Sequence, residues 1–154
     1  MLTFLRIQNV ALIDKLEVEL SAGLCLLTGE TGSGKSIIVD SLGALAGGRV
    51  TNDLVKQGSD SATIEGEFQP SSQSPVWRAL ETAGIENNSD STIIIRRDVS
   101  LAGKNRVFIN GQLTTAAVLN IVGEHLVDIH GQGEQASLYD VEQHRVLLDE
   151  FADY

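Results

Sequence analysis

The first 28 residues alternate between apolar and polar positions in a way that predicts three short strands. An apolar set begins at Leu2, and Lys15 to Leu20 alternates strictly, as a half-buried strand does. After a turn at Ser21-Ala22-Gly23, the stretch Leu24 to Thr28 is apolar almost throughout. Such a run is typical of a central strand covered on both faces, and it makes Cys25 a small core residue.

A helix is predicted directly after this third strand. Gly29 to Gly34 form a glycine-rich loop, and the apolar residues that follow recur at helical spacing until Gly47-Gly48 ends the pattern. One face of the predicted helix carries Ile37, Ile38, Ser41, Leu42 and Leu45. A strand, a glycine loop and an amphipathic helix in this order are what a phosphate-binding loop requires.

The second half of the chain predicts further strands and short helices. The strands are Ser61 to Gln69, Thr92 to Val99, Asn105 to Ile109, Gln112 to Leu113 and Leu126 to Ile129. The helices are Val76 to Ala83, Ala116 to Val122 and a last one from Tyr139 onward. Asn110-Gly111, between two of the strands, favours a tight type I′ hairpin turn because both residues accept a positive φ.

The loop and the start of the helix match the pattern G-x-x-x-x-G-K-[ST] in full. The matching residues are Gly29, Glu30, Thr31, Gly32, Ser33, Gly34, Lys35 and Ser36. A chance match is expected in roughly one chain of this length in a hundred, or fewer. In such a loop the glycines let backbone N–H groups point at phosphate oxygens. Lys35 reaches the β- and γ-phosphates and the Ser36 hydroxyl ligates Mg²⁺, so the pattern predicts ATP and Mg²⁺ as cofactors.

The composition of the chain bears on whether it can bind DNA and on where in the cell it is expected. The net charge is −10, the opposite of the basic surplus found in most proteins that hold DNA unaided. A DNA contact therefore needs a local basic patch, another part of a longer protein or a dimer; otherwise the acidity only keeps the domain soluble. The lone cysteine, the lack of a long apolar run and the lack of a secretory signal pattern predict a cytoplasmic protein with no membrane partner.

Other features bear on the class of P-loop protein. The paired strands before the loop strand are expected for ATP-binding-cassette-like heads rather than for small GTPases, and no N-K-x-D guanine-reading pattern is present. Gln132 follows an apolar segment far downstream of the loop. A self-contained small-molecule or nucleotide kinase is the alternative. Such an enzyme needs an acceptor pocket and usually a lid with clustered arginines, and the sequence shows neither pattern.

Four stretches resemble the N-terminal head segment of the RecN family of bacterial DNA repair proteins, which is related to the SMC ATPases. They are Leu5 to Asn9, Thr28 to Arg49, Arg106 to Gly111 and Asp128 to Gln132. The resemblance implies an α/β fold, the N-terminal half of an ABC/SMC-like P-loop NTPase head, with a mixed sheet and an antiparallel β subdomain. It also implies that Gln132 is a Q-loop glutamine that completes the Mg²⁺ shell, although the residues alone leave open that it only caps a strand end. The family commonly has histidine where this chain has Gly133.

The resemblance also divides the chain near residue 138. It implies that residues 1–138 are the N-terminal lobe of the head with the P-loop, and that residues 139–154 are a helix leading toward a coiled coil absent from this chain. Val146 to Glu150 looks like a Walker B strand, but the apolar residues around it recur at helical spacing and predict an amphipathic helix. The chain would then lack the Walker B, catalytic glutamate and signature elements, so we expect it to be inactive alone.

The implied partners are the protein's own C-terminal head segment, a second head in an ATP-dependent homodimer, and DNA in double-strand-break repair through the full-length protein. The basic residues available for DNA are Arg49, Lys56, Arg96, Arg97, Lys104 and Arg106. Arg49 and Lys56 follow the P-loop helix, where SMC-like heads resemble one another in placing DNA-contacting or partner-contacting residues. These two are the candidate contacts, with a solvated surface role as the alternative for each, and the implied location is on the nucleoid.

Overall fold

The computed structural model describes residues 1–28, 34–87 and 91–130. In these residues six strands form one sheet in the order β2-β1-β3-β4-β5-β6, and every neighbouring pair is antiparallel. The strands are β1 (Leu2–Val10), β2 (Ile13–Glu19), β3 (Ser61–Phe68), β4 (Ile93–Ser100), β5 (Arg106–Ile109) and β6 (Gln112–Thr114). The helices are α1 (Lys35–Leu45), α2 (Val76–Thr82) and α3 (Ala116–Gly123), with a short 3₁₀ helix η1 (Asn52–Leu54).

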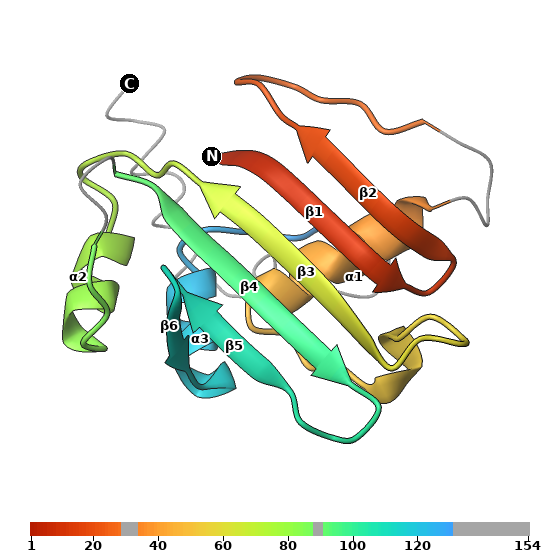
Figure 1. Cartoon of the computed structure of the whole chain (residues 1–154). Helices are drawn as coiled ribbons and strands as arrows, with labels where there is room; N and C mark the ends of the chain where they lie inside the picture. The colour runs from red at the N-terminus through yellow and green to blue at the C-terminus, as the bar shows by residue number, and fades with distance from the viewer. Residues whose placement is uncertain (29–33, 88–90, 131–154) are drawn as a thin grey trace.

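Alternation along the strands decides which face of the sheet is buried. The inward residues of the two central strands are Ala62, Ile64, Gly66 and Phe68 in β3 and Ile93, Ile95, Arg97 and Val99 in β4. Figure 1 shows α1 crossing behind the sheet, with α3 behind β5 and β6. The apolar inward residues form one buried cluster with Leu45 of α1 and with Leu119 and Val122 of α3. One face of the sheet is therefore core and the other is open, as is common for antiparallel sheets.

A glycine in β3 sets how closely α1 approaches the sheet. A Cβ atom added at Gly66 would lie 2.7 Å from Cδ1 of Leu45 and 3.1 Å from Cε2 of Phe68. Both neighbours are fully buried, so α1 occupies the space that a larger residue would need. The absence of a side chain at this position allows the helix to pack directly onto the strand.

Most of the elements expected from the sequence are confirmed. The alternating segments before and after the P-loop form β2 and β3, and the segments expected as short helices form α2 and α3. The hairpin between β5 and β6 turns at Asn110 and Gly111, whose φ angles of 53° and 77° are both positive, as a type I′ turn requires. The antiparallel strands and the type of the β5–β6 turn are thus confirmed.

The strand expected over Leu24 to Thr28 is not formed, and this prediction is wrong. The segment has no regular structure and belongs to no strand of the sheet, with Leu24 89% and Leu26 77% exposed. Cys25 is likewise exposed rather than part of the core. A fully apolar strand is stable only between neighbouring strands and under cover on both faces, and the described residues supply neither.

The strand expected over Leu126 to Ile129 is also wrong. The backbone N–H groups of Leu126 and Val127 both donate to the carbonyl of Gly123, at 3.0 Å each, so the chain turns off the end of α3 instead of pairing with a strand. The predictions for Gln132, Gly133 and the helix over residues 139–154, including the segment Val146 to Glu150, lie outside the described residues. Within the described ranges, no helix combines the length and apolar character needed to cross a membrane.

Candidate phosphate-binding site at the start of α1

The helix α1 begins at Lys35, the lysine of the glycine-loop pattern. Gly29 to Ser33 lie outside the described residues, while Gly34, Lys35 and Ser36 are described. Gly34 is the N-cap residue, and the first helical hydrogen bond runs from Ile38 N–H to the Gly34 carbonyl at 3.1 Å. The last three residues of the motif therefore form the N-terminal end of a helix, as predicted.

The first turn of α1 lacks the side chains that usually stabilise the start of a helix. It has no side-chain cap and no acidic residue, although acidic residues are favourable at that end of a helix. The contrast is α3, where the Thr115 hydroxyl oxygen accepts a hydrogen bond from Val118 N–H at 3.2 Å. Backbone N–H groups at such a helix start, with the positive end of the helix dipole, favour a phosphate. The chemistry of this end therefore fits the phosphates of a nucleotide.

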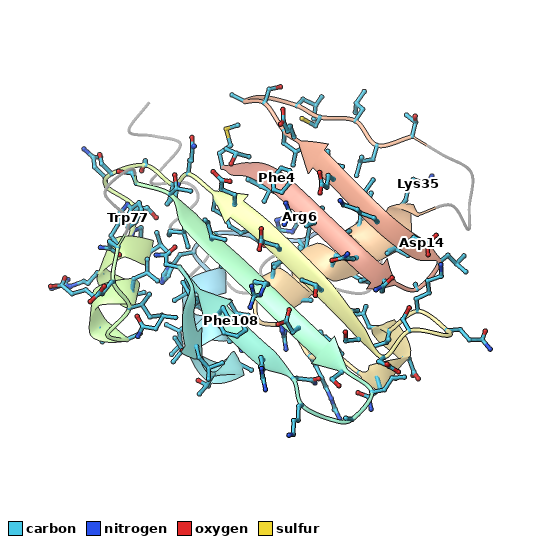
Figure 2. The ribbon with its side chains drawn as sticks, viewed as in Figure 1. Phe4, Arg6, Asp14, Lys35, Trp77 and Phe108 are labelled. Atoms are coloured by element: carbon cyan, nitrogen blue, oxygen red, sulfur yellow. The ribbon has the colours of Figure 1, made fainter. Side chains whose placement is uncertain are left out.

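The β1–β2 hairpin lies beside this helix start. A Cβ atom at Gly34 would be 3.6 Å from Cδ1 of Ile13, and Figure 2 shows Lys35 on the same side of the molecule as the hairpin turn and Asp14. Asn9 near the end of β1 and Ala11 in the turn have positive φ angles of 54° and 50°, a conformation that is uncommon for residues other than glycine. Ile13, the first residue of β2, thus lies next to the start of α1.

The end of η1 and the residues just after it provide contacts that hold the hairpin turn. Ala11 N–H donates to the Leu54 carbonyl at 2.8 Å, and Lys56 N–H donates to the Asn9 carbonyl at 2.9 Å. The Lys56 ammonium also forms an ion pair with Asp14 of β2. Lys56, predicted as a DNA contact, therefore already has an anionic partner within the chain, whereas Arg49, the other candidate, is exposed. Whether either residue touches DNA stays a prediction.

Two adjacent arginines of β4 lie on opposite faces of the sheet. Arg96 faces outward, where it forms an ion pair with Asp98 at 3.5 Å and stacks on Phe108 with 4.3 Å to the ring centroid. Arg97 is only 4% exposed, so its place among the candidates for a DNA-facing patch was wrong. The alternation of β4 could have shown this, because Arg97 shares its parity with the buried Ile95 and Val99.

Arg97 reaches the far end of the P-loop helix. Its Nη1 donates to the Ala44 carbonyl at 2.9 Å and to the Gly48 carbonyl at 2.6 Å. Burial lowers the pKa of the Arg97 guanidinium below its ordinary value, but a guanidinium remains charged at neutral pH. A buried cation thus lies at the C-terminal end of the helix whose N-terminal end carries Lys35.

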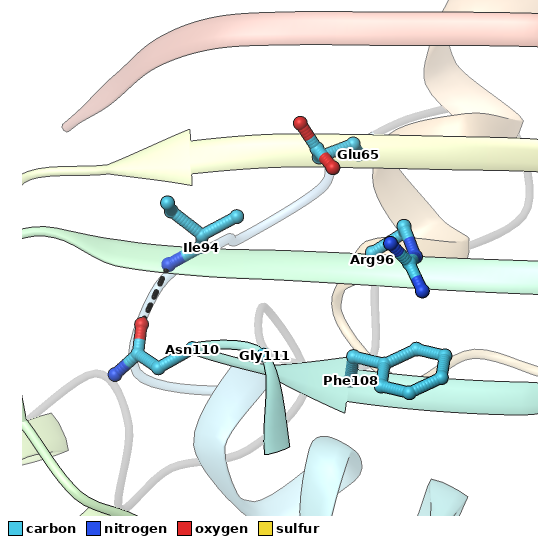
Figure 3. Close-up of a pocket in the computed structure, with 6 residues that line it drawn as sticks. All are labelled: Glu65, Ile94, Arg96, Phe108, Asn110 and Gly111. Carbon is cyan, nitrogen blue, oxygen red and sulfur yellow. Dashed lines mark hydrogen bonds between the residues drawn. The ribbon is translucent and has the colours of Figure 1, made fainter. Parts of the chain in front are cut away.

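A shallow hollow of about 370 Å³ lies on the open face of the sheet. Figure 3 shows its lining residues, which are Glu65, Ile94, Arg96, Phe108, Asn110 and Gly111. Inside it, Ile94 N–H donates to Oδ1 of Asn110 at 3.0 Å, the bond drawn as a dashed line. Because Arg96 points away from the face that α1 covers, this hollow is separate from the phosphate site.

Several solved structures share this fold. One from work on ATP-driven dimerization and DNA-stimulated activation of SMC ATPases matches with a TM-score of 0.64 and 21% identity, covering 97% of this chain and 98% of that one. The Pyrococcus furiosus Smc head domain, bound to the C-terminal domain of ScpA, matches with a TM-score of 0.62 and 22% identity over 79% of this chain and 32% of that one. The recombination mediator protein RecF with ATP matches with a TM-score of 0.57 and 17% identity, covering 74% of this chain and 27% of that one. The fold is that of a P-loop ATPase head of the SMC and RecF type.

Sequence relatives place the chain more closely. Residues 5–148 match the model of the AAA domain family. DNA repair protein RecN is 46% identical in Halalkalibacterium halodurans and 45% identical in Bacillus subtilis, over 99% of this chain in both cases. The chain spans about a quarter of the length of these relatives, 27% and 26%. The chain therefore belongs to the AAA domain family, and its sequence is RecN-like over nearly its whole length, which confirms the resemblance inferred from the motifs.

Proposed function

We propose that this chain is the ATP- and Mg²⁺-binding N-terminal half of a RecN-like ATPase head that acts in the recombinational repair of DNA double-strand breaks. The observation that carries the proposal is the start of α1 at Lys35, in a full P-loop motif and with a first turn that has neither a side-chain cap nor an acidic residue. The RecN relatives, which are named as DNA repair proteins, support the biological role.

The motif residues divide the work of holding a nucleotide. Backbone N–H groups of Gly29 to Gly34 would surround the phosphates, and Lys35 would neutralise charge on the β- and γ-phosphates. The Ser36 hydroxyl would ligate Mg²⁺, and Gln132 would complete the metal shell. The metal ion that these residues would hold would supply positive charge to offset the negative charge of the phosphates.

The exposed apolar segment before the P-loop supports the protein's own C-terminal head segment as a partner. Leu24, Leu26 and Leu27 are 89%, 77% and 52% exposed, although each is apolar and they are nearly consecutive. A run of this kind normally has a covering surface. A strand from the C-terminal head segment would pair with this run and cover it, which would produce the central strand that the sequence pattern predicted.

The distribution of charge supports a role for DNA only in the larger assembly. The chain carries a net charge of −10, so it would neutralise few DNA phosphates by itself. In the proposal two heads associate around ATP and the full-length protein holds DNA, with Arg49 and Lys56 as candidate contacts. The proposed location is the cytoplasm, on the nucleoid.

A self-contained kinase is the less favoured function. The solved structures with this fold that are described above are SMC and RecF ATPase heads, and the sequence relatives are RecN proteins. On the described residues, the hollow on the open sheet face lies on the side of the sheet away from α1 and so offers no acceptor site next to Lys35.

Hydrolysis of ATP tests the proposal. The chain alone is expected to show negligible steady-state turnover, because phosphoryl transfer needs the signature and Walker B elements as well as the phosphate loop. Adding the part of a RecN relative that this chain does not match should restore turnover, and Lys35→Ala should abolish the restored rate. Robust hydrolysis by the chain alone, lost in Glu150→Gln, would show that the chain has its own Walker B element and would contradict the half-head.

A further inference from the structure

The C-terminal end of α1 is held by a buried cation from another element. Arg97 of β4 donates from Nη1 to the Ala44 carbonyl at 2.9 Å and to the Gly48 carbonyl at 2.6 Å. These acceptors belong to the last turn of the helix and to the chain just beyond it, where the Ala44 carbonyl also accepts from Gly47 N–H at 3.2 Å. The last turn of α1 contains no basic residue of its own. Arg97 therefore satisfies the negative end of the helix dipole from the sheet.

Stability alone does not account for an arginine at this position. A buried charge is costly to desolvate, and among the ion pairs of the described residues none involves Arg97. Its neighbour Arg96, on the open face, has both a carboxylate and an aromatic partner. An apolar residue would fill the inward position of β4 at lower cost, as Ile95 and Val99 do. The guanidinium adds a fixed position of the helix on the strand, because its two hydrogen bonds join β4 to carbonyls at the end of α1.

The same end of α1 is also fixed from the side of α3. A Cβ atom at Gly47, whose φ is +94°, would lie 2.4 Å from Cα of Asn120, and one at Gly123 would lie 2.3 Å from the Ala46 carbonyl oxygen. Backbone therefore packs directly on backbone here, with no space for adjustment. By contrast, Lys35 is only partly buried and Ser36 is exposed at the other end of the helix.

A helix is stiff, so the constraint at one end reaches the other. With 11 residues α1 is roughly 16 Å long. A shift or tilt of the helix at Ala44 would therefore also displace Lys35 and Ser36. Even a small displacement of these residues would weaken phosphate binding, because charge-assisted contacts depend on short distances.

We propose that Arg97 is a positioning residue for the nucleotide phosphates, which fixes the C-terminal end of α1 against β4 and so sets where Lys35 and Ser36 stand. The inference rests on the proposed function, because it assumes that Lys35 and Ser36 contact Mg·ATP. Arg97 touches neither nucleotide nor metal in this account. It acts through the helix.

The test compares Arg97→Met, which keeps the length of the side chain and removes its charge and donors, with Arg97→Lys and with Leu80→Ala. Leu80 is fully buried in α2, and its truncation destabilises the core without removing either hydrogen bond of Arg97 to the end of α1. Affinity for Mg·ATP is measured by calorimetry at a temperature where thermal unfolding shows every variant to be folded. We expect Arg97→Met to weaken binding by about tenfold and Arg97→Lys by less, since one ammonium can serve one of the carbonyls well. Leu80→Ala should bind as the wild type does even at an equal loss of melting temperature.

Two results would overturn the inference. The first is that Arg97→Met binds Mg·ATP with an affinity within twofold of that of the wild type. If the methionine variant does not fold, an Arg97→Lys affinity equal to that of the wild type has the same meaning. The other is an equal loss of affinity in Leu80→Ala, which would mean that general destabilisation weakens binding. Failure of the wild type itself to bind Mg·ATP would instead contradict the proposed function, and the role of Arg97 would fall with it.

Discussion

Two cationic residues lie at opposite ends of α1, and the helix dipole stabilises one of them and destabilises the other. Arg97 lies at the negative C-terminal end, where a cation is stabilised. Lys35 lies in the first turn, where a cation is opposed by the dipole. A lysine at this position is hard to explain by helix stability and simple to explain by a bound polyphosphate, which it meets together with the backbone N–H groups. The electrostatics of single residues therefore support the phosphate site.

The next residue, Ser36, carries a prediction about the metal. Ser36→Ala should weaken ATP binding by about tenfold when Mg²⁺ is present and change it little in EDTA, because in the proposed site the hydroxyl contacts the metal rather than the phosphates. Calorimetric titrations with and without Mg²⁺ measure both affinities. Ser33→Ala is the matched control, since Ser33 occupies a variable position of the same motif. Equal losses in Mg²⁺ and in EDTA would show that Ser36 is not a metal ligand.

At the scale of elements, the sequence predicts best what depends on local pattern. Strict alternation was sufficient for β2 and β3, and two residues that accept positive φ were sufficient for the β5–β6 turn. Leu24 to Thr28 was misread because an apolar run becomes a strand only where other strands flank and cover it. The phosphate motif needed no tertiary information, since its chemistry lies in consecutive residues. The role of Arg97 needed the fold, because its partners in α1 are distant in sequence.

The tight packing at the end of α1 gives a prediction about stability. Gly47→Ala and Gly58→Ala both place a side chain at a positive φ, +94° and +91°, but only Gly47 faces backbone within 4 Å. We expect Gly58→Ala to lower the free energy of unfolding by about 1 kcal/mol through strain alone, and Gly47→Ala by about 3 kcal/mol or more. Urea unfolding followed by circular dichroism measures both. If the two variants lost equal stability, Asn120 would not restrain the helix end as the structure indicates.

At the scale of the whole molecule, three features of the chain agree with the half of an ATPase head that we propose. Its apolar segment before the P-loop is exposed, and its net charge of −10 disfavours DNA binding by the chain alone. The chain also spans only about a quarter of the length of its RecN relatives. Binding of nucleotide is the one activity in the proposal that the chain can show unaided, because the phosphate motif is complete within it.

The most direct test of the central claim is therefore a calorimetric titration of the chain with ATP and Mg²⁺, repeated on Lys35→Ala. We predict saturable binding of one nucleotide by the wild type and an affinity about a hundredfold lower in Lys35→Ala, because the variant lacks the ammonium group that would neutralise charge on the terminal phosphates. Lys104→Ala, which removes an exposed lysine from the β4–β5 turn, should bind as the wild type does. Equal affinity in the wild type and Lys35→Ala would contradict the phosphate site, and with it the account of this chain as a nucleotide-binding half-head.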